Sequence, residues 1–494
     1  MTRIAGAGLS IAALQGSRIR QSGQKINGRI HVLNAFRWAS AAALLAATTL
    51  GRVDAAEIAI QTNQPVLQFR DAAPGGAHPL GGQVKAFVDH ANAVLGPLGF
   101  SFTLHASGNI NPADRATVKP ALVAIKDFSA IHAAVARGAA AGGLNAAAGI
   151  PADSNMTFGE LMSGGAPFGL EADELMSFVY AGGGLELLQS FYDKKFDNGV
   201  KVIPIGITGA PGAGFFKEPL PDPDTDPSLT PETAMAALCR RPMIVRWSDT
   251  ASAVWAEACK RVGVEAASFG AATRCKDSTK LCDPARNPDN PVVNTPKGLT
   301  FGGFVPGVIP QTMAANGNID AYELNLPTED IQFLKLSQGL QNKSDAEVDL
   351  KGVAPPYSYG GAWHQPAVFV ELLINKAYWN ALPERDRRLI EATARSSLLS
   401  NFAIRNNLQA AAMKELARHG VVQLRWPRGL IDQLRAAMPA AMAQEAARYA
   451  ATGDDSFGRL YKAVSEYQAG LAVYADFGDI NQGAANIPTS PPKR

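Results

Sequence analysis

The sequence predicts an α/β protein with largely parallel sheets. Strand-type and helix-type hydrophobic patterns alternate along the chain, which is typical of βαβ units. The composition, with 47% hydrophobic and 18% charged residues, allows a sizeable core and excludes a wholly disordered protein. At about 150 residues per domain, a chain of 494 residues is long enough for two or three domains.

Five segments have the pattern of β-strands. Residues 57–62 and 100–104 alternate apolar and polar side chains, as half-buried strands do. The other three segments are short and almost continuously apolar, which indicates strands buried on both faces. These buried strands are expected at 201–208, 243–247 and 368–375.

Four segments have the pattern of helices. Apolar residues recur at helical spacing in 84–95, where a Gly-Pro pair ends the helix. A second helix is expected at 250–263, closed by a glycine. A proline begins a long helix over 383–419, and the last amphipathic helix extends over about 429–449.

Polar stretches separate these elements. Loops or insertions are expected at 219–228, 270–300 and 337–352, which are rich in Pro, Asp, Asn or other polar residues. The tail after residue 478 is rich in Pro and Ser and is expected to be disordered.

The N-terminal region predicts export. Residues 38–50 form an apolar run that follows basic residues, and small residues precede a cleavage site near Ala55. The run is too short to span a bilayer of about 30 Å comfortably. An N-terminal membrane anchor is the alternative. The mature protein is expected to be soluble.

The charge balance excludes a strongly basic nucleic-acid binder, and no nucleic-acid partner is expected. The net charge is +2, from 46 basic and 44 acidic residues. Residues 1–56 hold seven of the basic residues and one of the acids, so the remainder carries 39 − 43 = −4. The basic surplus therefore belongs to the export segment.

Four cysteines suit an exported chain. Cys275 and Cys282 flank a short polar loop, which predicts a surface hairpin closed by a disulfide. Cys239 and Cys259 are a plausible second pair, although both can instead be buried free thiols. The sequence leaves the connectivity open, and the spacing does not favour zinc.

Motifs of catalysis are not evident. The sequence contains neither HExxH nor GxSxG, and its seven histidines have no ligand spacing. The glycine-rich 209–214 lacks the Gly-Lys-Ser/Thr ending of a phosphate loop and predicts a turn after a strand. These observations favour a binding role over an enzyme.

Five segments contain short sequence motifs in a fixed order, among them APFG, ITGAPGAG, PMIVRW, IDAYELNLP and GGAWHQP. The segments are 164–193, 202–216, 242–264, 309–330 and 359–383. They resemble the solute-binding proteins of TRAP (tripartite ATP-independent periplasmic) transporters, and most closely the branch that binds 2-oxo acids. The likeness spans about residues 155–400.

The resemblance implies a two-lobe periplasmic binding protein fold. Strands cross between two α/β lobes, long helices span both lobes, and the solute binds in the interlobe cleft. The expected divisions are a signal peptide at 1–55, lobe I at 56–170 plus 322–365, lobe II at 171–321 plus 366–450 with insertions near 219–230 and 270–300, and a C-terminal helix with a disordered tail at 451–494.

The resemblance also implies a function. The protein would capture a 2-oxo acid or another carboxylate in the periplasm and deliver it to integral-membrane TRAP subunits, with uptake driven by an ion gradient. Some relatives form dimers through a long helix, and 383–419 is long enough for a homodimer. Two alternatives stay open: an exported hydrolase of unrecognised type, and a ligand-sensing binding protein without transport.

Two residues are the main candidates for solute contact. Arg246 ends a predicted buried strand, and its planar fork can hold a carboxylate bidentately. The resemblance implies this role, and an internal acid is the alternative partner. Trp363 follows a Gly pair and can wall a pocket and supply an indole donor, with core packing as the alternative.

Four further residues are weaker candidates. Glu323 matches an acid near the ligand and its metal ion in the family, with a solvated surface acid as the alternative. Thr208 offers a hydroxyl either to a ligand or to its own turn. The resemblance places Phe168 and Asn145 on loops that border the cleft.

The resemblance implies a Na⁺ or Ca²⁺ ion that bridges the solute and the protein. The sequence departs from the family at the residues that would bind this ion. Glu323 and Gln365 are the candidate metal ligands. Pro211 stands where the family has a glutamine, Gln365 replaces an acid, and Leu324 replaces a tryptophan. Hard cations prefer oxygen ligands, so these changes weaken the implied metal site. Alanines at 147 and 148 replace aromatic residues and leave room for a larger solute.

Overall fold

A computed structural model describes most of the chain after residue 55. It covers 56–62, 79–106, 118–120, 128–145, 161–162, 166–241, 243–245, 249–265, 299–301, 320–323, 326–337, 348–351, 354–361 and 363–478. The signal peptide expected at 1–55, Arg246, Cys275, Cys282 and the tail after residue 478 lie outside these ranges. The described residues all belong to the compact unit Val53–Arg494. None of the described helices combines the length and hydropathy needed to cross a membrane.

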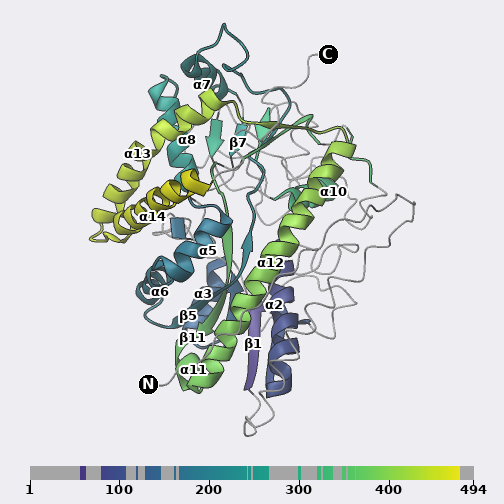
Figure 1. Cartoon of the computed structure of the whole chain (residues 1–494), viewed down its shortest axis with the longest axis vertical. Coiled ribbons are helices and arrows are strands. Elements are labelled where there is room, and N and C mark those ends of the chain that lie inside the picture. Colours follow the sequence, from purple (N-terminus) through teal and green to yellow (C-terminus); the bar gives the residue numbers. More distant parts are fainter. Residues whose placement is uncertain are drawn as a thin grey trace, which may run out of the picture. The chain divides into compact units, whose positions relative to one another are not determined.

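The first sheet gathers the N-terminal strands. Its described strands have the order β3-β2-β1-β4-β11-β5, and Figure 1 labels β1, β5 and β11. Strands β1 to β4 are parallel, whereas β11 runs antiparallel to both β4 and β5. The bounds are β1 Ala56–Thr62, β2 Phe100–Ala106, β3 Val118–Pro120, β4 Gly142–Asn145, β5 Val200–Thr208 and β11 Val368–Asn375. Buried positions run almost unbroken along β5 and β11, as their continuous apolar sequences predict.

The second sheet is built from shorter strands. Its described strands have the order β12-β10-β6-β9-β7-β8. Strand β7 is parallel to β8 and β9, and β6 runs antiparallel to β9 and β10. The bounds are β6 Phe215–Phe216, β7 Met243–Val245, β8 Leu299–Phe301, β9 Ala321–Tyr322, β10 Tyr357–Gly360 and β12 Val422–Arg425.

Sheet membership differs from the division expected from the sequence. Strands β5 and β11, expected in lobe II, join the N-terminal strands, because β11 pairs with both β4 and β5. Strand β10, expected in lobe I, pairs with β6 and β12 in the second sheet. The chain therefore passes from one sheet to the other between β5 and β6, between β10 and β11, and between β11 and β12.

Helices cover both sheets. The first group is α2 Pro79–Leu95 with the 3-10 turn η1 Gly96–Leu98, α3 Phe128–Ala136, α5 Ala172–Ala181 and α6 Gly184–Lys195. The second is α7 Pro231–Cys239, α8 Asp249–Arg261 and α10 Pro327–Ser337. The last is α11 Lys376–Ala381, α12 Glu384–Arg418, α13 Arg428–Ala450 and α14 Ser456–Gly478. The helices expected at 84–95, 250–263, 383–419 and 429–449 are confirmed.

Helix α12 spans the cores of both sheets, as Figure 1 shows. Near its start, Ile390 and Ala394 pack with β1, β2 and α2. Near its end, Ala412 and Leu416 pack with β6, β9 and α10. The expectation of a long helix that spans both parts of the fold is confirmed.

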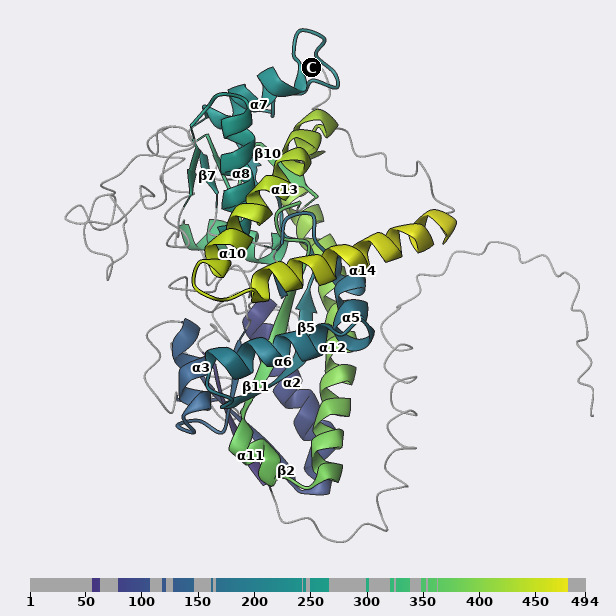
Figure 2. The ribbon, with the colours of Figure 1, turned by 90° about the vertical axis from the view of Figure 1, so that its left-hand side faces the viewer.

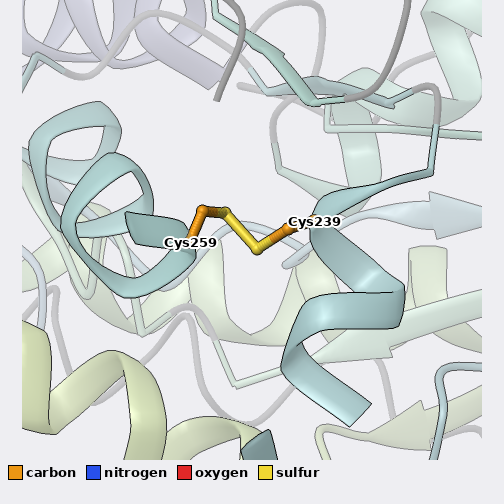
Figure 3. Close-up of a disulfide and its surroundings, with 2 residues drawn as sticks. All are labelled: Cys239 and Cys259. Carbon is orange, nitrogen blue, oxygen red and sulfur yellow. A yellow bond between two sulfur atoms is a disulfide. The ribbon is translucent and has the colours of Figure 1, made fainter. Parts of the chain in front are cut away.

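A disulfide joins two helices beside the second sheet (Figure 3). Cys239 ends α7, Cys259 lies near the end of α8, and their Cα atoms are 5.8 Å apart. Both residues are buried. The pairing that the sequence left open is therefore Cys239 with Cys259.

Candidate functional site

A pocket lies beside the second sheet, and most of its wall is aromatic. Its lining comes from β6, β7, β9 and α8, and from segments that follow β5, β10 and β12. Its main apolar side chains are all at most 6% exposed; they are Phe216, Met243, Trp255, Trp363 and Trp426. An apolar concavity with a few polar groups is the usual form of a small-molecule site. This pocket is therefore the candidate functional site.

The three tryptophans contact one another edge to face. The ring centroid of Trp363 lies 5.6 Å from that of Trp255 and 6.3 Å from that of Trp426. Trp255 and Trp426 are 5.8 Å apart. Pairs of this geometry contribute about 0.5–1.5 kcal/mol beyond their buried area. Mutual packing thus fixes the positions of the three indole rings. Trp363 both packs in the core and lines the pocket.

Strand alternation brings Glu323 to the pocket. Strand β9 runs between β6 and β7, and successive side chains of a strand point to opposite faces. Ala321 packs on the pocket side, whereas Tyr322 packs against Phe215 on the other face. Glu323 comes next, lines the pocket and is 6% exposed. The alternative of a solvated surface acid is therefore excluded.

His364 forms a polar corner with Glu323. The His364 Nε2 and Glu323 Oε1 atoms are 3.5 Å apart, and both side chains are buried. A buried carboxylate needs compensating partners, and at this distance the imidazole compensates the charge when it is protonated. His364 stands between the sequence-predicted residues Trp363 and Gln365, and the sequence offers no motif or ligand spacing that singles it out.

Trp426 contributes a buried donor. It follows β12 and lines the pocket, and its indole Nε1 has no hydrogen-bond partner among the described residues. An unmade hydrogen bond at a buried donor costs about 1–3 kcal/mol. An acceptor atom on a solute or a water would remove this cost.

Phe168 packs against Trp363. Their ring centroids are 5.5 Å apart, and the Phe168 N–H donates to the Trp363 carbonyl oxygen at 2.5 Å. The structure thus brings together Phe168, Trp363 and Glu323, three of the residues that the sequence singled out.

Thr208 ends β5, and its hydroxyl is engaged by the neighbouring strand. Its Oγ1 accepts a hydrogen bond from Val368 N at 3.0 Å, and the side chain is 4% exposed. A hydroxyl can donate as well as accept, so this bond does not use its hydrogen. The observed contact agrees with the reading of Thr208 as a structural hydroxyl.

The remaining sequence-predicted residues are Asn145, Gln365 and Arg246. Asn145 ends β4, where it pairs in register with Glu371. Gln365 is half-buried and is not one of the pocket-lining residues. Arg246 lies outside the described residues, directly after β7, whose Met243 lines the pocket.

The described donors fit a hard cation only in part. Glu323 is the one carboxylate among the described lining residues, and the described residues contain no group of three or more His, Cys, Asp or Glu side chains placed to hold a metal. Calcium takes about six to eight oxygen ligands. Glu323 can supply one or two of these, and the others would have to come from solute, water or backbone oxygens.

No protein-family model and no curated protein matches this sequence. Solved structures do match. A TRAP transporter solute-binding protein from Bordetella bronchiseptica is 16% identical, with 86% of this chain and 95% of that chain covered at a TM-score of 0.55. It is a mixed-occupancy dimer with copurified calcium and picolinate bound in one active site and an apo site.

Two further structures are similar to the same extent. A TRAP periplasmic solute-binding protein from Pseudoalteromonas atlantica, with bound sodium and pyruvate, is 17% identical; the match covers 87% of this chain and 99% of that chain at a TM-score of 0.56. Its counterpart from Colwellia psychrerythraea, with bound calcium and pyruvate, is 16% identical, covering 86% and 98% at 0.54.

At these sequence identities the likeness establishes the fold. The matches extend over nearly the whole length of the solved chains. The observed elements agree, since the described chain has two mixed sheets covered by helices, three crossings between them and a long helix that packs on both cores. The chain therefore has the two-lobe α/β fold of the TRAP periplasmic solute-binding proteins.

Proposed function

We propose that this protein is a periplasmic solute-binding protein of a TRAP-type transporter and that its solute is an organic acid. One observation carries the proposal: a buried pocket in this fold brings together Glu323, Trp363, His364 and the indole N–H of Trp426, which has no hydrogen-bond partner among the described residues. Such a site offers apolar surface and a few directed polar groups, which is what selective binding of a small molecule needs.

The ligands of the structural neighbours support a carboxylate. Picolinate and pyruvate each carry one, and calcium or sodium accompanies them. A 2-oxo acid or another carboxylate is therefore the proposed solute class. Glu323 is the proposed side-chain ligand of an accompanying cation, and Gln365 is a weaker candidate because its side chain is a neutral amide.

Arg246 is the proposed clamp for the solute carboxylate. In the sequence it directly follows β7, and Met243 of β7 lines the pocket. Its fork can accept a carboxylate with two parallel hydrogen bonds. Thr208 and Asn145 remain proposed contacts from the first sheet.

Capture would proceed by hinge closure. Two segments that connect the two sheets, between β5 and β6 and between β10 and β11, contribute Ala213, Gly214 and Trp363 to the pocket. A solute that touches groups from both sheets favours the closed arrangement through those contacts. The closed protein would then deliver the acid to integral-membrane transporter subunits, after export directed by residues 1–55. A homodimer is a further proposal, in line with the Bordetella dimer.

Calorimetry with picolinate and pyruvate, in calcium and in chelator, tests this function. We expect binding of at least one acid, and Arg246→Ala should weaken it at least 100-fold while the thermal unfolding temperature of the solute-free protein stays unchanged. Arg240→Ala is the matched control, because Arg240 is exposed at the end of α7. Undiminished affinity of Arg246→Ala would reject the clamp, and turnover of the bound acid would favour the alternative of an exported enzyme.

A further inference from the structure

Phe168 occupies a turn position where the backbone favours glycine. In the turn Ala166–Gly169, the Gly169 N–H donates to the Ala166 carbonyl at 3.0 Å, and Pro167 is the second residue. Phe168 has a φ of 53°, in the left-handed region that side-chain-bearing residues avoid. A glycine would adopt this conformation without steric cost. The conformational cost of phenylalanine is offset only if its contacts are favourable.

Phe168 contacts both Trp363 and the C-terminal helices. Its N–H and its ring contact the carbonyl and the ring of Trp363. The Arg435 guanidinium lies 4.6 Å from the centroid of the Phe168 ring. The Gln468 Nε2 donates to the Phe168 carbonyl oxygen at 2.9 Å. Phe168 is therefore clamped between the pocket wall and two C-terminal helices.

The two helices that carry the clamp are themselves anchored. Arg435 lies on α13, which packs along α8, the helix that carries Trp255 (Figure 2). Gln468 lies on α14, which contacts α13 and α5. Next to Gln468, the Tyr467 hydroxyl donates to Ser177 Oγ of α5 at 2.6 Å. These contacts fix where Arg435 and Gln468 meet Phe168.

We propose that Arg435 and Gln468 are positioning residues for the pocket: they lock Phe168 in its left-handed conformation and thereby hold Trp363 in the geometry that binds the solute. The inference rests on the proposed function for its consequence in binding. The clamp itself is a property of the solute-free protein. Helices α13 and α14 thus control the pocket through Phe168 without touching the solute.

Three substitutions separate the clamp from general stability. Gln468→Met keeps the length of the side chain and removes the donor to the Phe168 carbonyl. Phe168→Gly keeps the turn, because glycine accepts the positive φ, and removes the ring between Trp363 and Arg435. Tyr467→Phe is the matched control on the same helix, since it removes the bond to Ser177 and leaves the Phe168 contacts intact.

Two measurements test the proposal. Amide hydrogen exchange of the solute-free protein should become at least 5-fold faster in peptides covering 166–170 and 361–366 for Gln468→Met and Phe168→Gly, but not for Tyr467→Phe. Calorimetry with picolinate in calcium chloride should show about 3- to 10-fold weaker binding for Gln468→Met, as expected for one lost hydrogen bond, and a larger loss for Phe168→Gly.

The outcomes distinguish the clamp from the proposed function. Unchanged exchange in both variants overturns the clamp, and faster exchange with wild-type affinity overturns its positioning role. A wild-type protein that binds neither picolinate nor pyruvate counts against the proposed function, and the exchange measurement still decides on the clamp because it needs no solute.

Discussion

At the residue scale, a carboxylate from the first sheet and a phenol from α6 are buried together. Glu371 on β11 is fully buried, and the Tyr192 hydroxyl donates to its Oε2 at 2.5 Å. The Tyr192 oxygen also lies 3.3 Å from His132 Nε2. A phenol has one hydrogen to donate, so it accepts from the imidazole at this second contact. Burial, followed by the neighbouring Glu371 carboxylate, raises the pKa of Tyr192 well above 10.

Replacing Tyr192 tests this network. Tyr192→Phe removes a donor to a buried carboxylate, and we expect the free energy of unfolding to fall by about 1–3 kcal/mol at pH 7 in urea denaturation. Tyr180→Phe is the control, because the Tyr180 hydroxyl makes one longer bond, to the Pro204 carbonyl at 3.3 Å. Equal losses in the two variants would contradict a special role for the Glu371 pair.

Buried tyrosines also predict how stability depends on alkaline pH. Burial raises the pKa of Tyr359 to about 12. Because this folded value lies above the unfolded value of about 10, the stabilisation is fully present below pH 10 and is lost as the pH rises through 12. Urea denaturation between pH 9 and 11.5 should show falling stability, with a flatter dependence in Tyr359→Phe. Parallel curves for the two proteins would refute the assignment to Tyr359.

The pocket contains residues that the sequence singles out and residues that it does not. Glu323 and Trp363 were found because each stands in a segment that resembles a family with a known site. His364 and Trp426 line the same pocket, but the signal for them is spatial. Trp426 follows a four-residue strand that is separated from Trp363 by the whole of α12, and no periodicity links the two.

At the element scale, patterns within one segment predicted that segment well. The buried strand over 368–375 has the bounds of β11, and the helix over 383–419 differs from α12 by one residue at each end. The sequence predicted a loop at 219–228, but it did not predict that this loop caps another helix. There Asp224 accepts hydrogen bonds from Arg428 N and Gly429 N at the start of α13. That cap joins residues about 200 positions apart, which a local pattern cannot show.

The disulfide between α7 and α8 is predicted to stabilise this pair of helices. It closes a loop over a sequence separation of 20, for which the chain-entropy model gives about 3 kcal/mol of unfolding free energy. Cys239→Ala with Cys259→Ala should lose this amount in urea denaturation. Either single substitution should cost nearly as much, since the crosslink is lost in every case. Additive losses of the two single variants would contradict the crosslink as the source.

At the scale of the whole molecule, the sequence was sufficient for the fold class and insufficient for the division into sheets. Alternating strands and helices identified an α/β chain. The return of β11 to the first sheet depends on antiparallel pairing with β4 and β5, and the paired residues are at least 160 positions apart in the sequence. Pairing at such distance is decided by tertiary packing, and the strand pattern is the same in either sheet.

The composition of the pocket leads to a prediction about cation and solute together. Glu323 is its one described carboxylate, and a calcium ion needs about six to eight oxygens. The solute's own carboxylate and keto oxygens would add further ligands, with water or backbone oxygens supplying the rest, so the cation site is less complete without the solute. Their binding should therefore be coupled, and coupling is reciprocal: each must raise the affinity of the other by the same factor.

Calorimetry can measure both arms of this coupling. Calcium alone should bind weakly, and saturating pyruvate should strengthen its binding about 10- to 100-fold, a coupling within the common range of 1–3 kcal/mol. Pyruvate affinity should rise by the same factor in saturating calcium. Glu323→Gln should abolish the coupling, because it removes the anionic oxygens at the pocket. Glu232→Gln, an exposed acid in the first turn of α7, should leave the coupling unchanged. Calcium that binds equally well with and without pyruvate would show that the protein completes the cation site by itself.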